Sequence, residues 1–125
     1  MSKKVKTALS CALLAALVAA VPSATLHFDL SRSVPEAGAT VPAPSEITLW
    51  FTEVPQDNSI SIRLIDPRGD LVDSTEPNQD AEDGTMFSIA PSASVAPGEY
   101  TVAWRGIGQD GHTVRGDFGF TVGAR

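Results

Sequence analysis

The chain has 125 residues, a net charge of −6 and a single cysteine. This length indicates one domain. No basic patch is visible in the acidic sequence, which excludes charge-driven binding to nucleic acid or to anionic membrane surfaces. The single cysteine, Cys11, lies within an apolar leader, so the rest of the chain has no disulfide and no thiolate metal site.

The first 26 residues have the pattern of a signal peptide. Lys3, Lys4 and Lys6 precede an apolar run over residues 8–20, and small residues follow it. This run is too short to favour a membrane span. We therefore predict a signal peptide over residues 1–26 and a domain over residues 27–125. Three of the nine basic residues lie in the leader, so six remain against fifteen acidic residues, a net charge of −9.

The cleavage position stays open between residues 20 and 26. A cut after Ala20 satisfies the preference of signal peptidase for small residues, and a cut after Ala24 is a further alternative. A cut directly before His27 would leave Leu26 as the last residue of the leader. Each position gives a different amino terminus to the exported domain.

The remaining chain reads as all-β. Apolar residues that are β-branched or aromatic, or that alternate with polar ones, predict strands over residues 47–51, 59–66, 86–89, 100–104 and 116–122. Proline, glycine and aspartate punctuate these runs, and the acidic stretch 73–84 is expected to be a solvated loop. Short strands at this spacing favour a small Greek-key β-barrel or sandwich of immunoglobulin-like type. We expect five aromatic residues to anchor its core: Trp50, Phe51, Trp104, Phe118 and Phe120.

Two histidines, His27 and His112, are the only ones in the chain, and the second belongs to an Asp110-Gly111-His112 triplet between two strand-like runs. Residues two apart share one face of a strand, and at a strand end the glycine lets the backbone turn so that both side chains converge. Imidazole suits copper, zinc and nickel, and a carboxylate neutralises charge. The same triplet is also an ordinary turn signal, so both interpretations stay open on the residues alone.

The sequence resembles the CopC-type periplasmic copper-binding proteins. The likeness is carried by HFDL at 27–30 with SVPEAG at 33–38, by LWFTE at 49–53, and by PGEYTV at 97–102 running into DGH at 110–112 and GDFGFTV at 116–122. It spans essentially the whole segment after the leader. The family fold that it implies, a small Greek-key barrel or sandwich, agrees with the strand pattern.

The resemblance also implies a site. One Cu(II) ion per chain would be held by His27, through its α-amine and imidazole, and by Asp110 and His112. Glu53 would stand behind these ligands and accept hydrogen bonds from the ligand end of the chain. A cut after Ala20 would remove the amine as a ligand. A cut after Ala24 would make His27 the third residue, and the free amine, two amide nitrogens and its imidazole could then chelate Cu(II) or Ni(II) in a square plane. Asp29 stands where many family members carry a second histidine, and it is a candidate for a further carboxylate near the site.

The function implied by the resemblance is that of a periplasmic Cu(II) carrier or buffer in copper homeostasis or resistance. Met86 is the only methionine after the leader, so a methionine-rich Cu(I) site is not expected. We expect a monomer without enzymatic activity that passes copper to a membrane copper transporter or a periplasmic copper enzyme, in import or in detoxification. Two alternatives stay open: a histidine-brace copper oxidase, and a β-sandwich interaction module without metal.

Overall fold

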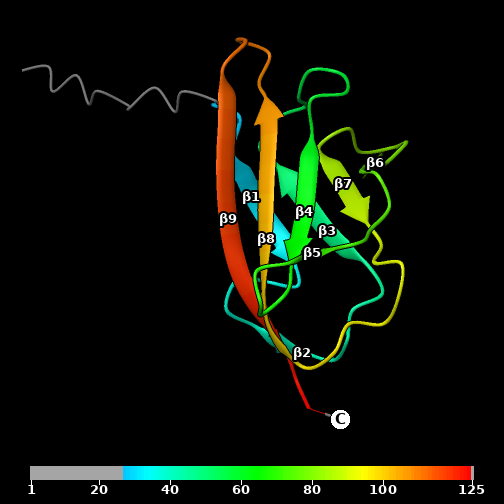
Figure 1. The fold of residues 1–125 in the computed structure, drawn as a ribbon. Coiled ribbons are helices and arrows are strands. Elements are labelled where there is room, and N and C mark those ends of the chain that lie inside the picture. Colours follow the sequence, from blue (N-terminus) through cyan, green and yellow to red (C-terminus); the bar gives the residue numbers. More distant parts are fainter. Residues whose placement is uncertain (1–26, 125) are drawn as a thin grey trace, which may run out of the picture.

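A computed structural model of the chain describes residues 27–124, which form nine strands and no helix (Figure 1). No helix in this range is available to cross a membrane. The predicted signal peptide lies outside the described residues. The strands are β1 (Leu30–Val34), β2 (Thr40–Val41), β3 (Ile47–Phe51), β4 (Ser61–Ile65), β5 (Leu71–Val72), β6 (Asn78–Gln79), β7 (Met86–Ile89), β8 (Gly98–Ile107) and β9 (Thr113–Val122).

The strands form two sheets, with the orders β1-β3-β7-β6 and β2-β9-β8-β4-β5. All pairs are antiparallel except β2 with β9. Within the described residues the chain crosses between the sheets five times, at the connections β1–β2, β2–β3, β3–β4, β5–β6 and β7–β8. The two layers lie one behind the other in Figure 1. The prediction of an all-β sandwich is therefore confirmed.

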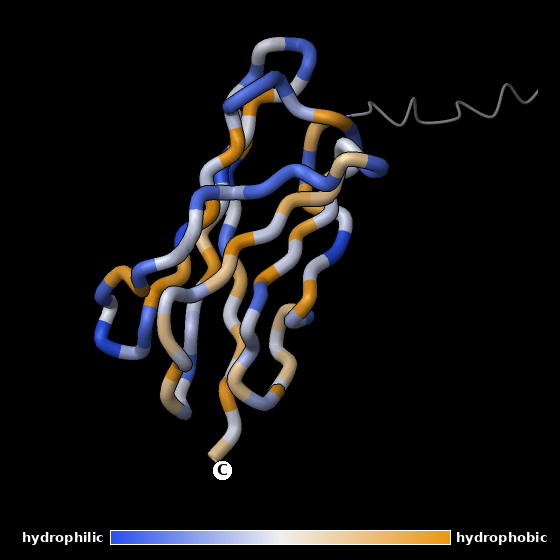
Figure 2. Tube along the Cα trace, turned by 90° about the vertical axis from the view of Figure 1, so that its right-hand side faces the viewer, coloured by the Kyte–Doolittle hydropathy of each residue, from blue (hydrophilic) through white to orange (hydrophobic). Residues whose placement is uncertain are grey.

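The core lies between the two sheets. Along β4 and β8, buried residues alternate with more exposed ones, as the colours of Figure 2 show along the strands. Leu64 and Val102 from one sheet and Leu49 from the other are fully buried. The rings of Phe51 and Trp104 meet across the layers with centroids 5.4 Å apart. This aromatic contact joins the sheets at the end of the sandwich that carries the β8–β9 loop.

The structure extends and corrects the strand predictions. Strands β3 and β7 have the predicted bounds, whereas β8 and β9 are each ten residues long and pair along their full length. The short strands β2, β5 and β6 have only two residues each, too few for a period-two pattern to appear. Strand β1 was also missed. Strand β6 lies within the predicted acidic loop.

The aromatic core was predicted in part. Phe51, Trp104 and Phe120 are buried, but Trp50 is only half-buried, and the guanidinium of Arg32 stacks over its ring 3.8 Å from the centroid. Trp50 follows Leu49 on β3 and therefore points to the opposite face of the sheet. Phe118 is likewise only partly buried. Three aromatic residues that were not predicted complete the core: Phe28, Phe87 and Tyr100.

Candidate metal centre

The β8–β9 loop closes the hairpin with a tight turn at the end of the sandwich opposite the carboxyl terminus (Figure 1). The Gly111 N–H donates to the Gly108 carbonyl at 2.9 Å, and the Gly108 N–H donates to the His112 carbonyl at 3.1 Å. Gly111 has a φ of 83°, in the left-handed region that favours glycine. This turn brings the side chains on both sides of Gly111 to one face of the loop.

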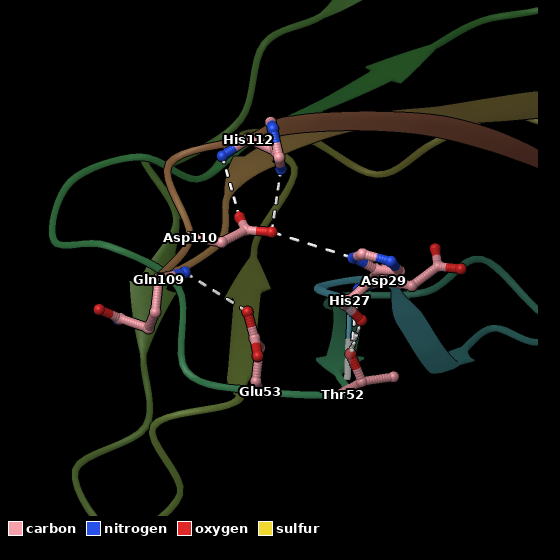
Figure 3. A network of polar contacts seen from close by, with 7 residues as sticks. All are labelled: His27, Asp29, Thr52, Glu53, Gln109, Asp110 and His112. Atoms are coloured by element: carbon pink, nitrogen blue, oxygen red, sulfur yellow. Dashed lines mark hydrogen bonds and ion pairs between the residues drawn. The ribbon is translucent and has the colours of Figure 1, made fainter. Parts of the chain in front are cut away.

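Asp110 and His112 are joined within this turn. Asp110 Oδ1 accepts a hydrogen bond from the His112 backbone N–H at 3.0 Å, and Asp110 Oδ2 lies 3.0 Å from His112 Nδ1 (Figure 3). The backbone N–H of His112, and then its ring, hold the pKa of the Asp110 carboxyl below its usual range. Asp110 is therefore a carboxylate at neutral pH, the form that binds metal ions.

His27 reaches the same carboxylate from the other side. Its Nδ1 lies 3.9 Å from Asp110 Oδ2, so the two imidazole rings flank one carboxylate oxygen (Figure 3). The side chains of His27 and His112 are 66% and 81% exposed, and that of Asp110 is 45% exposed. The structure thus brings together all three residues that the sequence singled out as ligands, at an open surface.

Thr52 fixes the backbone beside His27. Its hydroxyl donates to the His27 carbonyl at 2.9 Å and accepts from the Asp29 N–H at 3.0 Å, while its own N–H donates to the Asp29 carbonyl at 2.8 Å. These three bonds bracket the segment that carries the first histidine. They add to the pairing of β1 with β3, which begins only at Leu30.

Phe28 anchors the same segment in the core. It is 2% exposed, its ring stacks on Phe51 at 4.8 Å between centroids, and it meets Trp104 edge-on at 6.3 Å. Gly106 makes room for it, because a Cβ at that position would lie 2.6 Å from the Phe28 ring. Since His27 directly precedes Phe28, burial of this ring determines where the imidazole can reach.

Glu53 supports the other half of the site. Its Oε1 accepts from the Gln109 N–H at 3.4 Å, and Gln109 Nε2 donates to the Val54 carbonyl at 3.0 Å. The predicted supporting role of Glu53 at the ligand end of the chain stays a prediction. Its carboxylate contacts the loop that carries Asp110 and His112. Gly108 leaves room for this contact, because a Cβ there would lie 2.9 Å from Glu53 Oε1 and 3.1 Å from Asp110 Oδ1.

Asp29 does not join the cluster. Its Oδ1 accepts a hydrogen bond from the Leu30 N–H at 2.8 Å, and its carboxylate points away from Asp110 in Figure 3. The Asp29 carboxylate, a candidate for a further acidic group near the site, therefore points away from the cluster.

The donor types fit a metal ion with tetragonal coordination, although the side chains are not yet arranged around a common point. Within residues 27–124, no three histidine, cysteine or acidic side chains already have the spacing of a complete metal site. The His112 ring is engaged with Asp110, and His27 lies just beyond hydrogen-bond distance. Because both rings are well exposed, changes of side-chain rotamer can turn their nitrogens towards a shared ion. Two imidazoles and a carboxylate then offer three of the nitrogen and oxygen donors that Cu(II) favours.

Comparison with known proteins identifies the family. The CopC domain model matches residues 30–123. The chain belongs to the CopC family. Copper resistance protein C of Escherichia coli is 31% identical over 106 residues, which cover 80% of this chain and 84% of that protein.

Two solved structures are similar along nearly their whole length. CopC from Methylosinus trichosporium OB3b is 30% identical, with a TM-score of 0.70 over 77% of this chain and 93% of that chain. PcoC, a methionine-rich copper resistance protein from Escherichia coli, is 29% identical, with a TM-score of 0.70 over 78% of this chain and 99% of that chain. Proteins of the CopC family are copper-binding carriers and not enzymes. This favours the predicted carrier over the oxidase.

Three supporting residues were missed in the sequence: Phe28, Thr52 and Gly108. Phe28 and Thr52 lie within the motifs that carry the resemblance, next to His27 and Glu53 respectively, so their positions were visible and their roles were not. Gly108 is buried beneath the loop. A glycine directly before Gln109 and Asp110 gives no sign in the sequence of the two carboxylates packed against it.

Proposed function

We propose that this protein is a periplasmic carrier or buffer of Cu(II), which binds one ion per chain through His27, Asp110 and His112. The observation that carries the proposal is the position of Asp110 Oδ2 between two imidazoles that are far apart in the sequence. It lies 3.0 Å from His112 Nδ1 and 3.9 Å from His27 Nδ1. The ionised carboxylate neutralises part of the charge of a divalent cation. The exposure of the rings suits a cargo that must be loaded and released.

The proposed oxidation state follows from the donor types. Two imidazoles and a carboxylate are borderline-to-hard ligands that suit Cu(II), whereas Cu(I) favours thiolates and thioethers. Residues 27–125 contain no cysteine, and Met86 is their only methionine. One thioether is not a methionine cluster, so we propose no methionine-rich Cu(I) site in this chain.

The amino terminus decides whether a fourth donor exists. We propose that residues 1–26 are a signal peptide and that residues 27–125 form the exported domain. Cleavage directly before His27 would place an α-amine beside its imidazole and complete four donors. Cleavage after Ala20 would leave a short extension, and the site would then rest on the three side chains alone. Cleavage after Ala24 would place His27 third in the chain, where the amine, two amide nitrogens and the imidazole form a square-planar chelate that competes with Asp110 and His112.

Glu53 contributes indirectly to the proposed site. Through the Gln109 N–H it holds the loop that carries Asp110 and His112. Outer partners of this kind orient metal ligands and commonly account for 10–100-fold in affinity. We further propose that the monomer passes its copper to a membrane copper transporter or to a periplasmic copper enzyme.

Native mass spectrometry of the protein exported from its own signal, with one equivalent of Cu(II), tests the proposal. The measured mass gives both the cleavage site and the number of bound ions. We expect one copper per monomer at any of the three cleavage positions, most firmly held in a chain that begins at His27. A protein that retains no copper would share the family fold without the proposed function.

A further inference from the structure

The fold assembles a cationic surface that the sequence does not show. Arg63 on β4, Arg105 on β8 and Arg115 on β9 are all exposed on the outer face of the larger sheet. Arg105 and Arg115 are direct cross-strand partners. Arg63 is diagonal to Arg105, because Ser61 is the residue opposite Arg105. Three positions spread over more than fifty residues of sequence thus become neighbours on one face.

These three arginines are not neutralised by the domain itself. None of their side chains forms an ion pair or hydrogen bond with another residue of 27–124. Like charges placed directly opposite each other on a sheet are destabilising. The pair Arg105–Arg115 therefore costs folding stability, and no ion pair with a carboxylate of residues 27–124 offsets this cost. Arg32, by contrast, has a partner, because it stacks over Trp50.

The arginines line a shallow groove. Its floor contains small side chains, those of Ser61 and Ala103, and Asp117 is its one acidic lining residue. The surrounding domain is acidic, with fifteen acidic residues in the whole chain, all of them after the leader. The groove is therefore a local cationic surface on a molecule of opposite overall sign. A guanidinium group binds a carboxylate through two parallel hydrogen bonds. The groove therefore suits the carboxylates of acidic side chains.

The groove adjoins the proposed copper site. Arg105 and Arg115 lie on the hairpin whose loop carries Asp110 and His112, and only two cross-strand pairs separate them from the loop. Arg115 is three residues from His112, about 10 Å along an extended strand. A chain seated on the arginines would thus reach the open side of the metal ligands with its next few residues.

We propose that this groove, defined by Arg63, Arg105 and Arg115, docks an extended acidic segment of a partner protein that exchanges copper with the site. The proposal rests on the proposed function for its purpose, but the docking itself needs no metal. An acidic protein segment fits better than an anionic membrane, because the remaining surface of the domain is strongly negative and would be repelled by a bilayer of the same sign. Complementary charge at such a rim speeds encounter and fixes orientation.

The test is an NMR titration of the metal-free, ¹⁵N-labelled protein with a ten-residue peptide of alternating glutamate and serine. We expect shift changes centred on β4, β8 and β9 around the three arginines, weakened by added salt. The double variant Arg105→Ala/Arg115→Ala should bind the peptide about tenfold more weakly, because two exposed charge pairs are lost. The control Arg68→Ala removes an exposed arginine from the β4–β5 turn and should change nothing.

Equal peptide affinity in the double variant and the control, or shift changes located elsewhere, would overturn the proposal. Binding of vesicles that contain phosphatidylglycerol, without binding of the peptide, would assign the groove to membranes and would equally overturn it. Copper affinity of the double variant is measured in parallel. If the wild-type protein binds the peptide but no copper, the docking groove stands and the proposed function fails; the reverse result leaves the proposed function and removes the groove.

Discussion

Two exposed turns of this domain have the same local hydrogen-bonding pattern, and only one of the two is a candidate metal centre. In the β8–β9 loop, Asp110 precedes Gly111 and His112; in the β6–β7 turn, Asp83 precedes Gly84 and Thr85. Each aspartate accepts a hydrogen bond from the backbone N–H two residues later, at 3.0 Å, and a second contact from the side chain at that position.

The shared pattern has the same electrostatic result in both turns. Hydrogen bonds from Thr85, first its hydroxyl and then its N–H, lower the pKa of Asp83, and those from His112 lower the pKa of Asp110. An ionised aspartate locked to its own turn is therefore a common structural device. What distinguishes the β8–β9 loop is an imidazole at the second position and another imidazole that arrives from His27.

The largest expected effect concerns that imidazole. Replacing His112 with alanine should lower Cu(II) affinity by more than about 100-fold, because even indirect partners of a ligand commonly account for 10–100-fold. The melting temperature of the metal-free protein should stay unchanged, since the side chain is 81% exposed. Thr85→Ala, at the equivalent position of the other turn, should leave copper affinity intact in a competition titration. Equal losses in both variants would contradict the assignment of ligands.

The second prediction concerns the anchor of His27. Phe28→Ala should destabilise the metal-free protein by about 3 kcal/mol, as expected for a buried phenylalanine, and should also weaken copper binding because His27 loses its fixed position. Phe87→Ala removes another buried ring that packs against Phe51, with centroids 5.8 Å apart. It should lose similar stability in denaturant titrations but keep copper affinity in the folded state. Equal copper affinities in the two variants would show that Phe28 does not position His27.

A smaller effect is expected at Gly108. An alanine there would press on Glu53 and Asp110, since its Cβ would lie 2.9 and 3.1 Å from their oxygens. We expect about tenfold weaker copper binding. Gly84→Ala is the matched change in the β6–β7 turn, where the Cβ would meet Val54 Cγ2 at 3.1 Å. Isothermal titration of both variants should separate them, and unchanged binding in Gly108→Ala would refute the role given to the glycine.

Thr52 should have a more modest influence. Thr52→Val keeps the shape of the side chain and removes the hydroxyl that bridges the His27 carbonyl and the Asp29 N–H. Copper affinity should fall a few-fold, and the loss of hydrogen bonds should cost about 1 kcal/mol of stability. Thr52→Ser retains the hydroxyl and should behave like the wild type. A valine variant with wild-type affinity would show that β1–β3 pairing alone places His27.

The smallest effect is the acid titration of the β6–β7 turn. Because the folded-state pKa of Asp83 is lowered, its stabilising contribution is complete above the unfolded-state pKa and is lost as pH falls through the folded-state value. Thr85→Val should raise the pKa of Asp83 towards its ordinary value and reduce this contribution. Copper binding should not change. Carboxyl-carbon NMR titration measures the shift, and an unmoved midpoint would contradict the hydrogen-bond explanation.

The sequence predicted the sandwich and the three ligands to different degrees. Alternation located β4 and the middle of β8, because those strands bury one face, and β-branched and aromatic residues located β3, which is buried along most of its length, and the short β7. Both Asp-Gly turns are equally visible in the sequence, and histidine alone distinguished Asp110 from Asp83. The approach of His27 to Asp110 depends on the burial of Phe28 against the opposite sheet, a tertiary contact that local patterns do not encode. The same holds for the three arginines, which only strand register makes neighbours.

The central claim is that one Cu(II) ion is held jointly by His27 and His112 with Asp110. Pulsed electron paramagnetic resonance of the exported protein with one equivalent of Cu(II) counts the coordinated imidazoles directly. We expect two imidazoles in the wild-type protein and one in His112→Ala. A single imidazole in the wild-type protein, or a spectrum that His112→Ala leaves unchanged, would contradict the site described for this domain.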